Sequence, residues 1–270
     1  MENENDNILE VRDLKVYFPI KKGVFSRTVG YVKAVDGVSF DLKRGETLGV
    51  VGESGCGKST TSRAILLLNK PCGGTIKVNG VDITKIHGKS AMTYRRTVQV
   101  VFQDPQAALD PRQTVIDLLT EGMVYHGLAT KAETRERAIE LLRAVGMPET
   151  ILDRYPHEFS GGQRQRLCIA RAIALRPELL ICDEAVSALD LTIRAQVLDL
   201  LADLKKKLGL SILFITHDLG VVQHIADRII VMNKGKIVER GTTEEVLKHP
   251  KEAYTKRLMA SVPIIGKPLV

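Results

Sequence analysis

The nine residues GESGCGKST at positions 52–60 restrict the possible folds of this 270-residue chain more than any other stretch. They match the pattern G-x-x-x-x-G-K-[ST], follow the apolar run TLGVV and precede the helix-forming segment KSTTSRAILLLN. The three glycines allow backbone N–H groups to curl around phosphate oxygens, and the helix N-terminus adds partial positive charge. Lys58 is predicted to bind the β- and γ-phosphates, and Ser59 to offer its hydroxyl to Mg²⁺. We therefore expect a triphosphate site where a strand passes into a helix.

Four polar side chains are expected at the ends of three further strands. The segment LLICDE places Asp183 and Glu184 after a buried strand, VVFQDPQ places Gln103 after another, and LFITHDL places His217 after a third. Ligands of open α/β sheets bind at such carboxyl ends. We expect Asp183 to hold Mg²⁺ through water, and Glu184 to accept a proton from the attacking water or to orient it. Gln103 is expected to reach the metal or the water, and His217 to hydrogen-bond the γ-phosphate. Taken alone, adjacent acids more often cap helices and a strand-end histidine is more often structural, but their order along one sheet favours a single site.

The rest of the chain alternates between strand and helix patterns. ILEVRDLKVYF alternates like a strand, AVDGVSFDLKRGETLGVVG predicts two strands around a turn, and GGTIKVNGVDI predicts a hairpin with Asn79 and Gly80 at its turn. Residues from about 111 to 146 are helical in pattern, and after Pro177 strands alternate with helices. This order predicts an α/β protein with a mostly parallel core sheet flanked by helices.

Three local features complete the predicted fold. Between the first two strands, PIKKGVFSRTVGY is basic and contains Gly and Pro, and we expect an exposed loop there. RIIVMNKGKIVERG is expected to form a closing hairpin. A terminal helix then begins in TTEEVLKHP, with Thr242 and Glu245 placed as a capping box.

Composition argues against several classes of protein. Apolar runs are far shorter than the roughly 20 residues of a membrane-spanning helix, and the start MENENDN lacks the layout of a signal peptide. The net charge of +7 suits an anionic ligand or membrane face, but the basic residues are scattered and aromatics are only 4%, which argues against nucleic-acid binding. The four cysteines lack the short paired spacing of zinc sites. We expect a cytosolic chain whose membrane role comes through a partner or a surface contact.

A second potential anion cradle, FSGGQRQR at residues 159–166, stands directly ahead of the LLICDE segment. With it, the chain resembles the nucleotide-binding subunit of ATP-binding cassette (ABC) transporters from Ile8 onward. The motifs of the family occur in its usual order: the phosphate loop at 52–60, Gln103, the signature at 159–163, the acidic pair Asp183 and Glu184, SALD at 187–190 and the switch histidine, His217. Phe159 stands where leucine is usual and Ala185 where many members have proline, but neither departure removes a catalytic group.

Longer stretches resemble one branch of the family. LKVYFPIKKGVFSRTVGYVKAVDGVSF, FQDPQAALDPRQTV and HPKEAYTKRLMASVP are similar to importers of oligopeptides, dipeptides or nickel, and most of all to the second ATPase subunit of the pair. Some relatives carry a C-terminal cysteine cluster for an iron–sulfur centre, which is not expected here because no cysteine follows Cys182. Peptide cargo is favoured over nickel or another small solute only because the resemblance leans that way.

The resemblance also implies a fold and a domain layout. The fold is that of a P-loop NTPase of the ABC type, with an N-terminal antiparallel β subdomain and an inserted α-helical subdomain. The implied layout is a disordered tail at 1–7, an ATPase domain at 8–250 with the helical subdomain at roughly 104–176, and a C-terminal extension at 251–270.

The implied activity is ATP hydrolysis coupled to transport, with ATP and Mg²⁺ as cofactors. Two ATPase subunits, identical or different, would close head to tail so that the signature of one chain meets the nucleotide of the other. The implied partners are two integral membrane permease subunits and, indirectly, an extracellular or periplasmic substrate-binding protein, at the cytoplasmic face of the cell (inner) membrane. Residues 103–112 would form the docking cleft for a permease helix.

The resemblance carries over residue by residue to the predicted site. Catalysis is assigned to Glu184, His217, Gln103 and Lys58. An aromatic ring that stacks on adenine is expected near the end of the first strand, where Phe18 is preferred to Tyr17 and Tyr31. The other predicted nucleotide contacts are Gly52, Glu53, Ser54, Gly55, Cys56, Gly57, Ser59, Thr60, Ser160, Gly161, Gly162 and Gln163. The predicted Mg²⁺ ligands are Ser59, Gln103 and Asp183.

Three other functions compete with this interpretation. A soluble ABC ATPase acting on ribosomes or DNA usually carries two cassettes or a long coiled-coil insertion, and this sequence shows neither. An exporter ATPase often comes fused to membrane-spanning helices. A non-catalytic nucleotide-binding scaffold would not need Lys58, Asp183, Glu184 and His217 together.

Overall fold

The computed structural model describes residues 6–23 and 26–260. The chain divides into two compact units, unit 1 from residues 1–85 and 214–270 and unit 2 from residues 86–213. Most of the predicted tail (1–7) and half of the predicted extension (251–270) lie outside the described residues, and the subdomain boundaries at 104 and 176 stay predictions. Within the described part, every helix is too short or too polar to cross a membrane.

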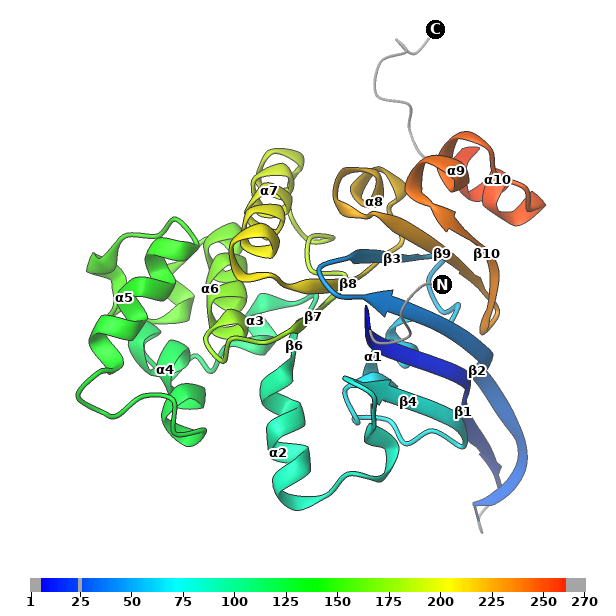
Figure 1. Cartoon of the computed structure of the whole chain (residues 1–270), viewed down its shortest axis with the longest axis horizontal. Helices are drawn as coiled ribbons and strands as arrows, with labels where there is room; N and C mark the ends of the chain where they lie inside the picture. Colours follow the sequence, from blue (N-terminus) through cyan, green and yellow to red (C-terminus); the bar gives the residue numbers. More distant parts are fainter. Residues whose placement is uncertain (1–5, 24–25, 261–270) are drawn as a thin grey trace, which may run out of the picture. The chain divides into compact units, whose positions relative to one another are not determined.

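Unit 1 contains an antiparallel sheet in which β1 lies between β2 and β4, shown in blue and cyan in Figure 1. Val11, Leu14 and Val16 of β1 lie in the core, and the three-residue step from Val11 to Leu14 coincides with a register shift at Asp13, whose φ is 47°. The predicted turn at Asn79 and Gly80 is confirmed, since both residues have positive φ angles (51° and 75°) as a tight hairpin turn requires. The strands of this sheet are β1 (Asn7–Lys22), β2 (Arg27–Lys43), β4 (Gly73–Val78) and β5 (Val81–Asp82).

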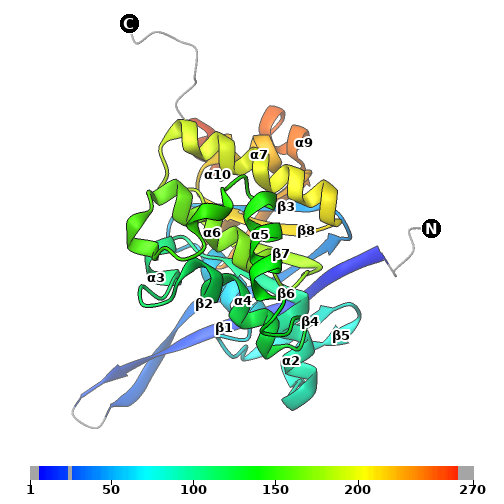
Figure 2. The same ribbon diagram turned by 90° about the vertical axis from the view of Figure 1, so that its left-hand side faces the viewer.

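The expectation of a loop for PIKKGVFSRTVGY is wrong for residues 19–22 and 27–31, which are strands, and residues 24 and 25 lie outside the described residues. β1 continues to Lys22 and β2 begins at Arg27, with Pro19 opposite Tyr31 and Lys22 opposite Arg27. The two strands form an arm that extends beyond the rest of unit 1 (Figures 1 and 2). Ladder hydrogen bonds and β-favouring residues such as Val29 outweigh the breaker signals, because Pro is tolerated where a strand needs no N–H.

A second group of strands in unit 1 holds the phosphate loop. β3 (Thr47–Val51) is fully buried and pairs in parallel with β9 (Arg228–Asn233), which pairs antiparallel with β10 (Lys236–Thr242). The predicted closing hairpin is therefore confirmed. The helices of this unit are α1 (Lys58–Ile65), α8 (Leu219–Ile225), α9 (Thr243–Lys248) and α10 (Ala253–Ala260), with a 3₁₀ turn at Ile83–Lys85.

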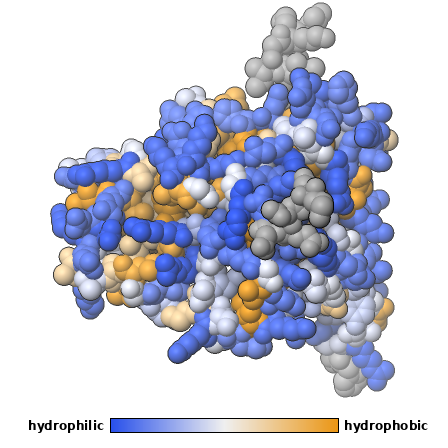
Figure 3. Space-filling view, viewed as in Figure 1, coloured by the Kyte–Doolittle hydropathy of each residue, from blue (hydrophilic) through white to orange (hydrophobic). Residues whose placement is uncertain are grey.

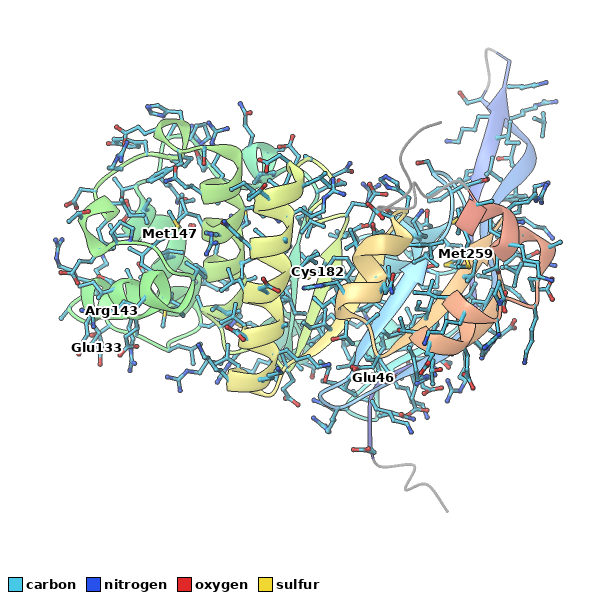
Figure 4. All side chains as sticks on the ribbon, turned by 90° about the horizontal axis from the view of Figure 1, so that it is seen from above. Glu46, Glu133, Arg143, Met147, Cys182 and Met259 are labelled. Atoms are coloured by element: carbon cyan, nitrogen blue, oxygen red, sulfur yellow. The ribbon has the colours of Figure 1, made fainter. Side chains whose placement is uncertain are left out.

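One hydrophobic cluster joins these elements. It combines Val51 of β3 with the apolar faces of α8, β9, α9 and α10, and Met259 of α10 packs against it (Figure 4). The predicted capping box at the start of α9 is confirmed: the Thr242 hydroxyl accepts from the Glu245 N–H at 3.2 Å, and the Glu245 carboxylate accepts from the Thr242 N–H at 2.8 Å. The C-terminal helices are thus fixed to the strand that leads into the phosphate loop.

Unit 2 contains two parallel strands, β6 (Val98–Val101) and β7 (Leu179–Asp183), and the chain returns to unit 1 within β8 (Ser211–Thr216). Figure 2 shows α4, α5 and α6 packed together in this unit. The predicted alternation of strand and helix after Pro177 is confirmed. The helices are α2 (Gly88–Thr97), α3 (Pro105–Ala108), α4 (Val115–Tyr125), α5 (Thr134–Ala144), α6 (Gly161–Ile173) and α7 (Leu191–Leu208), with 3₁₀ turns at Glu149–Ile151 and Pro156–Glu158.

Candidate nucleotide site

The phosphate loop of unit 1 has a backbone that only glycine can supply at two positions. Gly52 and Gly57 have φ angles of 153° and 110°. A Cβ atom at Gly52 would lie 2.3 Å from the Met232 carbonyl oxygen, and one at Gly57 would lie 2.3 Å from the Ala34 carbonyl oxygen. The loop is therefore pressed against the backbones of β2 and β9 on both sides, which holds it in one conformation.

The start of α1 is suited to an anion. Gly57 is the N-cap residue and no side chain caps the helix, and the first turn holds no acidic residue. The N–H groups of a first helical turn have no partners within the helix, so they can bind phosphate oxygens, and the helix dipole favours negative charge there. This geometry is what the sequence pattern predicts for residues 52–60.

Lys58 is buried within the loop that precedes it. Its side chain is 3% exposed, and Nζ donates to the carbonyl oxygens of Gly52 (2.6 Å) and Glu53 (3.0 Å) and lies 3.8 Å from the Cys56 sulfur. Burial raises the pKa of the Cys56 thiol, so this neighbour stays neutral near pH 7. The ammonium group is thus held by two carbonyl oxygens of the loop.

We expect Gly57→Ala to destabilise the chain much more than Gly55→Ala. Both glycines have positive φ, but a Cβ at Gly55 meets nothing within 4 Å, whereas one at Gly57 meets the Ala34 carbonyl oxygen. The combined strain and overpacking should lower the melting temperature of Gly57→Ala by about 5–15 °C, against about 2–4 °C for Gly55→Ala. Thermal denaturation followed by circular dichroism measures both; equal shifts would contradict the tight contact.

The aromatic residues near the end of β1 differ in how they are held. The Tyr17 hydroxyl donates to Asp36, and the Lys33 ammonium lies over the Tyr17 ring at 5.3 Å from its centroid. The hydrogen bond to Asp36 raises the pKa of Tyr17 to about 12 and lowers the pKa of Asp36. Phe18 is 42% exposed and Tyr31 61% exposed. Tyr17 is thus occupied by two polar partners, which supports the prediction that Phe18 stacks on adenine.

His217 lies in unit 1, between the end of β8 and the start of α8. It is exposed. The neighbouring Asp218 caps α8, with its carboxylate accepting from the N–H groups of Gly220 (2.9 Å) and Val221 (3.4 Å). The histidine is therefore carried by a rigid strand-to-helix turn, as its place in LFITHDL predicts.

In unit 2 the structure brings Gln103 and the acidic pair to one sheet edge. β6 and β7 run parallel with Val101 opposite Cys182, so Gln103 follows one strand where Asp183 ends the next. Asp183 is 6% exposed, Glu184 is half-buried and Gln103 is exposed. Glu184 has a positive φ of 52°, and Ser187 bonds its carbonyl oxygen through its N–H (3.1 Å) and its hydroxyl (2.9 Å). This strained turn fixes the position of the Glu184 backbone, from which the side chain extends.

Cys182 directly precedes the acidic pair in β7. It is fully buried in β7 (Figure 4). Burial raises the pKa of its thiol to about 12, so the sulfur stays protonated and unreactive near neutral pH.

The signature begins α6 with a capping box. The Ser160 hydroxyl accepts from the Gln163 N–H at 3.4 Å, and the Gln163 side chain accepts from the Ser160 N–H at 3.0 Å. A Cβ on Gly161 would meet nothing within 4 Å, whereas one on Gly162 would lie 2.5 Å from Cγ2 of Ile193. Gly161 therefore leaves the exposed face open, and Gly162 allows α7 to pack closely against α6.

Arg164, just after the signature, is a position that sequence reasoning missed. It donates to the Pro156 carbonyl oxygen (2.9 Å) and contacts the Gln106 side chain at 3.4 Å. Arg171, two turns later, donates to the Ala108 carbonyl oxygen at 2.7 Å. The helix that carries the signature thus holds the segment that follows Gln103, and the only sequence signal was a pair of arginines seven residues apart on one helix face.

The donor chemistry fits Mg²⁺. A hydroxyl, an amide and a carboxylate oxygen (Ser59, Gln103 and Asp183) are oxygen ligands of the kind that this ion prefers. No group of three or more His, Cys, Asp or Glu side chains among residues 6–23 and 26–260 is arranged to hold a metal by itself. Mg²⁺ usually binds through one or two protein oxygens together with substrate phosphates and water, so the ion would share this site with the nucleotide phosphates.

Comparison with known proteins gives the family. The sequence profile described as ABC transporter matches residues 35–187. The chain is 51% identical to the oligopeptide transport ATP-binding protein AppF of Bacillus subtilis, over 97% of the chain and 80% of the relative. It is 46% identical to the dipeptide transport ATP-binding protein DppF of Escherichia coli, over 95% and 76% of the two chains.

Solved structures agree with these relatives. The cbiO1 protein of Clostridium perfringens, part of the ABC transporter complex cbiONQ, superposes with a TM-score of 0.77 at 30% identity, over 90% of this chain and 92% of that one. The ATP-binding cassette MJ0796, in a dimeric post-hydrolysis state with ADP and Pi, superposes with a TM-score of 0.76 at 27% identity, over 87% and 98%. The predicted fold class is confirmed, and the chain belongs to the ABC transporter family with the fold of its ATP-binding cassettes.

Proposed function

We propose that this chain is the ATP-hydrolysing subunit of an ABC importer that takes up peptides. The observation that carries the proposal is the phosphate loop. Its Lys58 is buried, and no side chain caps the start of α1, the helix that Lys58 begins. The relatives from B. subtilis and E. coli are oligopeptide and dipeptide transport ATP-binding proteins at 51% and 46% identity. Their coverage extends over nearly the whole chain, which supports the same role here.

The roles of the site residues follow from their chemistry. Lys58 and the loop N–H groups would bind the β- and γ-phosphates, and Glu184 would accept a proton from the attacking water. Gln103 would orient that water, and His217 would hydrogen-bond the γ-phosphate. Phe18 would stack on adenine. When bound, Mg²⁺ supplies charge neutralisation at the phosphates, and Ser59, Gln103 and Asp183 would hold it directly or through water.

The signature is proposed to act on a nucleotide held by a second ATPase subunit. Gly161 leaves the α6 N-terminus open toward solvent, and the capping box keeps Ser160 in place. The similar cassette MJ0796 has a dimeric structure with ADP and Pi. We propose that two such subunits close over two ATP molecules, so that nucleotide binding favours the closed pair and hydrolysis releases it.

A groove in unit 2 is proposed to receive a permease helix. It is lined by Phe102 at the exit of β6, by Leu119 and Tyr125 of α4, by Arg171 of α6 and by Leu175 just after that helix. Tyr125 is 69% exposed, and apolar side chains reach the surface of unit 2 among hydrophilic ones in Figure 3. Its lining includes none of residues 103–112, where the resemblance implied the docking cleft. It does include Phe102, the residue before Gln103, and Arg171, which bonds Ala108, so an occupant could shift the segment that follows Gln103. The chain would then work as a peripheral subunit at the cytoplasmic face of the membrane.

The cargo class rests on the relatives. Besides AppF and DppF, the glutathione import ATP-binding protein GsiA of Salmonella typhimurium is 49% identical over 97% of this chain, which spans 42% of that relative. Glutathione is itself a short peptide, so relatives of this kind favour peptides over nickel. No residue of the nucleotide site would contact the cargo.

Uptake in a reconstituted importer tests the proposal. We expect proteoliposomes that contain this chain, its partner ATPase, the permeases and the binding protein to accumulate labelled di- to pentapeptides only with ATP and Mg²⁺ present. The same vesicles should accumulate no chelated nickel. ATP-dependent nickel uptake without peptide uptake would overturn the cargo class, and absence of ATP turnover in the assembled complex would overturn the enzymatic role.

A further inference from the structure

The C-terminal helix α10 makes a hydrogen bond to the phosphate loop. The N–H group of Glu53 donates to the hydroxyl oxygen of Tyr254 at 3.1 Å. The two residues are 201 positions apart in the sequence and both belong to unit 1. Tyr254 is 8% exposed, and burial raises the pKa of its hydroxyl, so the oxygen that accepts this bond is uncharged at physiological pH.

Glu53 is bonded on both sides of its peptide group. Its N–H meets Tyr254, and its carbonyl oxygen accepts from Lys58 Nζ at 3.0 Å and from the Cys56 N–H at 3.3 Å. Tyr254 therefore holds the residue that in turn holds the Lys58 ammonium. Lys58 itself has a second carbonyl partner, Gly52, at 2.6 Å.

The helix that carries Tyr254 is fixed independently of the loop. The Glu239 carboxylate of β10 accepts from the N–H groups of Lys251 (2.8 Å) and Glu252 (3.2 Å) just before the helix begins. These bonds lower the pKa of Glu239 despite its burial. Leu258 joins Tyr254 in the cluster that contains Val51, the last residue of the strand leading into the loop. The hydroxyl thus approaches the loop from a rigid support.

We propose that Tyr254 is a positioning residue of the nucleotide site. By holding Glu53, it orders the beginning of the phosphate loop and thereby positions Lys58. The proposal depends on the function proposed above in one respect only, namely that the loop binds ATP. It assigns a role in nucleotide binding to the segment after residue 250, outside every motif that the sequence displays.

The test compares full-length Tyr254→Phe with the unsubstituted chain. In Tyr254→Phe the hydroxyl is lost but the ring remains, so we expect amide hydrogen exchange in residues 52–57 to become about tenfold faster without nucleotide, while exchange in α6 stays unchanged. We expect the Kd for Mg-ATP, by isothermal titration calorimetry, to rise about threefold to tenfold. In the assembled complex KM should rise similarly with kcat within about threefold, because bound phosphates order the loop themselves.

A matched variant separates positioning from packing. Leu258→Val trims the same helix against the same cluster but keeps the hydroxyl, and we expect its Kd to stay within twofold of the unsubstituted chain even if its melting temperature falls as much. An unchanged exchange rate and Kd in Tyr254→Phe would overturn the proposal, as would equal effects of the two variants. If the unsubstituted chain bound no ATP, the proposed function would fail, but the exchange comparison in the ligand-free chain would still decide the role of Tyr254.

Discussion

Glu184→Gln is expected to lower ATP turnover by about 10²–10⁴-fold while ATP still binds. Glutamine has nearly the same shape, so the turn at Glu184, with its φ of 52° and its two bonds from Ser187, should persist. The amide cannot accept a proton from water, which removes the general base. The expected loss corresponds to about 3–5 kcal/mol of transition-state stabilisation. Turnover is measured as phosphate release by the assembled complex, and binding as the Kd for Mg-ATP.

The matched control for this variant is Glu149→Gln. Glu149 is an exposed acid of the same unit that pairs with Arg143 at 3.1 Å, so its loss changes the net charge equally. Exposed pairs contribute about 0–1 kcal/mol, and turnover should be unaffected. Near-normal hydrolysis in Glu184→Gln would exclude a general-base role. Loss of ATP binding would assign Glu184 to the nucleotide pocket instead.

Gly161→Asp is expected to abolish turnover in the assembled pair without harming the fold. A Cβ atom at this position meets nothing within 4 Å, and an acid in the first turn of α6 interacts favourably with the helix dipole by about 0.3–1 kcal/mol. The melting temperature should therefore stay equal or rise. Across the subunit interface, however, the carboxylate would face the γ-phosphate of the partner's nucleotide, and like-charge contacts of this kind cost several kcal/mol. Turnover should fall by at least about 10²-fold.

Gly161→Ala and the free subunit provide the controls. Alanine adds volume without charge, so its loss of turnover should be much smaller. The free Gly161→Asp subunit should bind Mg-ATP with a Kd within twofold of the unsubstituted chain. A raised Kd in the free subunit would show that the signature acts within its own chain. Gly162 is the poorer position for this test, because a Cβ there would collide with Ile193 and move α7.

Much of the fold follows from local patterns. The turn at Asn79 and Gly80, the capping box at Thr242 and the fully buried strand TLGVV are each specified by neighbouring residues, so the sequence predicts them correctly. The arm at residues 19–23 and 26–31 is different. Its breaker residues predict a loop, yet pairing with the opposite strand continues through Pro19 and Gly30. Ladder bonds depend on the partner strand, which a local pattern does not report.

The sequence alone determined which family supplies the fold of this protein, and it predicted the chemistry: which residues would bind phosphate and which acid would accept a proton. These properties reside in short motifs whose residues are close in the chain. Only the tertiary structure decided which distant residues hold those motifs in place. Tyr254 contacts Glu53 across 201 positions of the sequence, and Arg164 contacts Gln106 across 58. Such contacts form when packed elements bring distant segments together. A tyrosine or arginine that makes one therefore looks, in sequence, like any other helix residue.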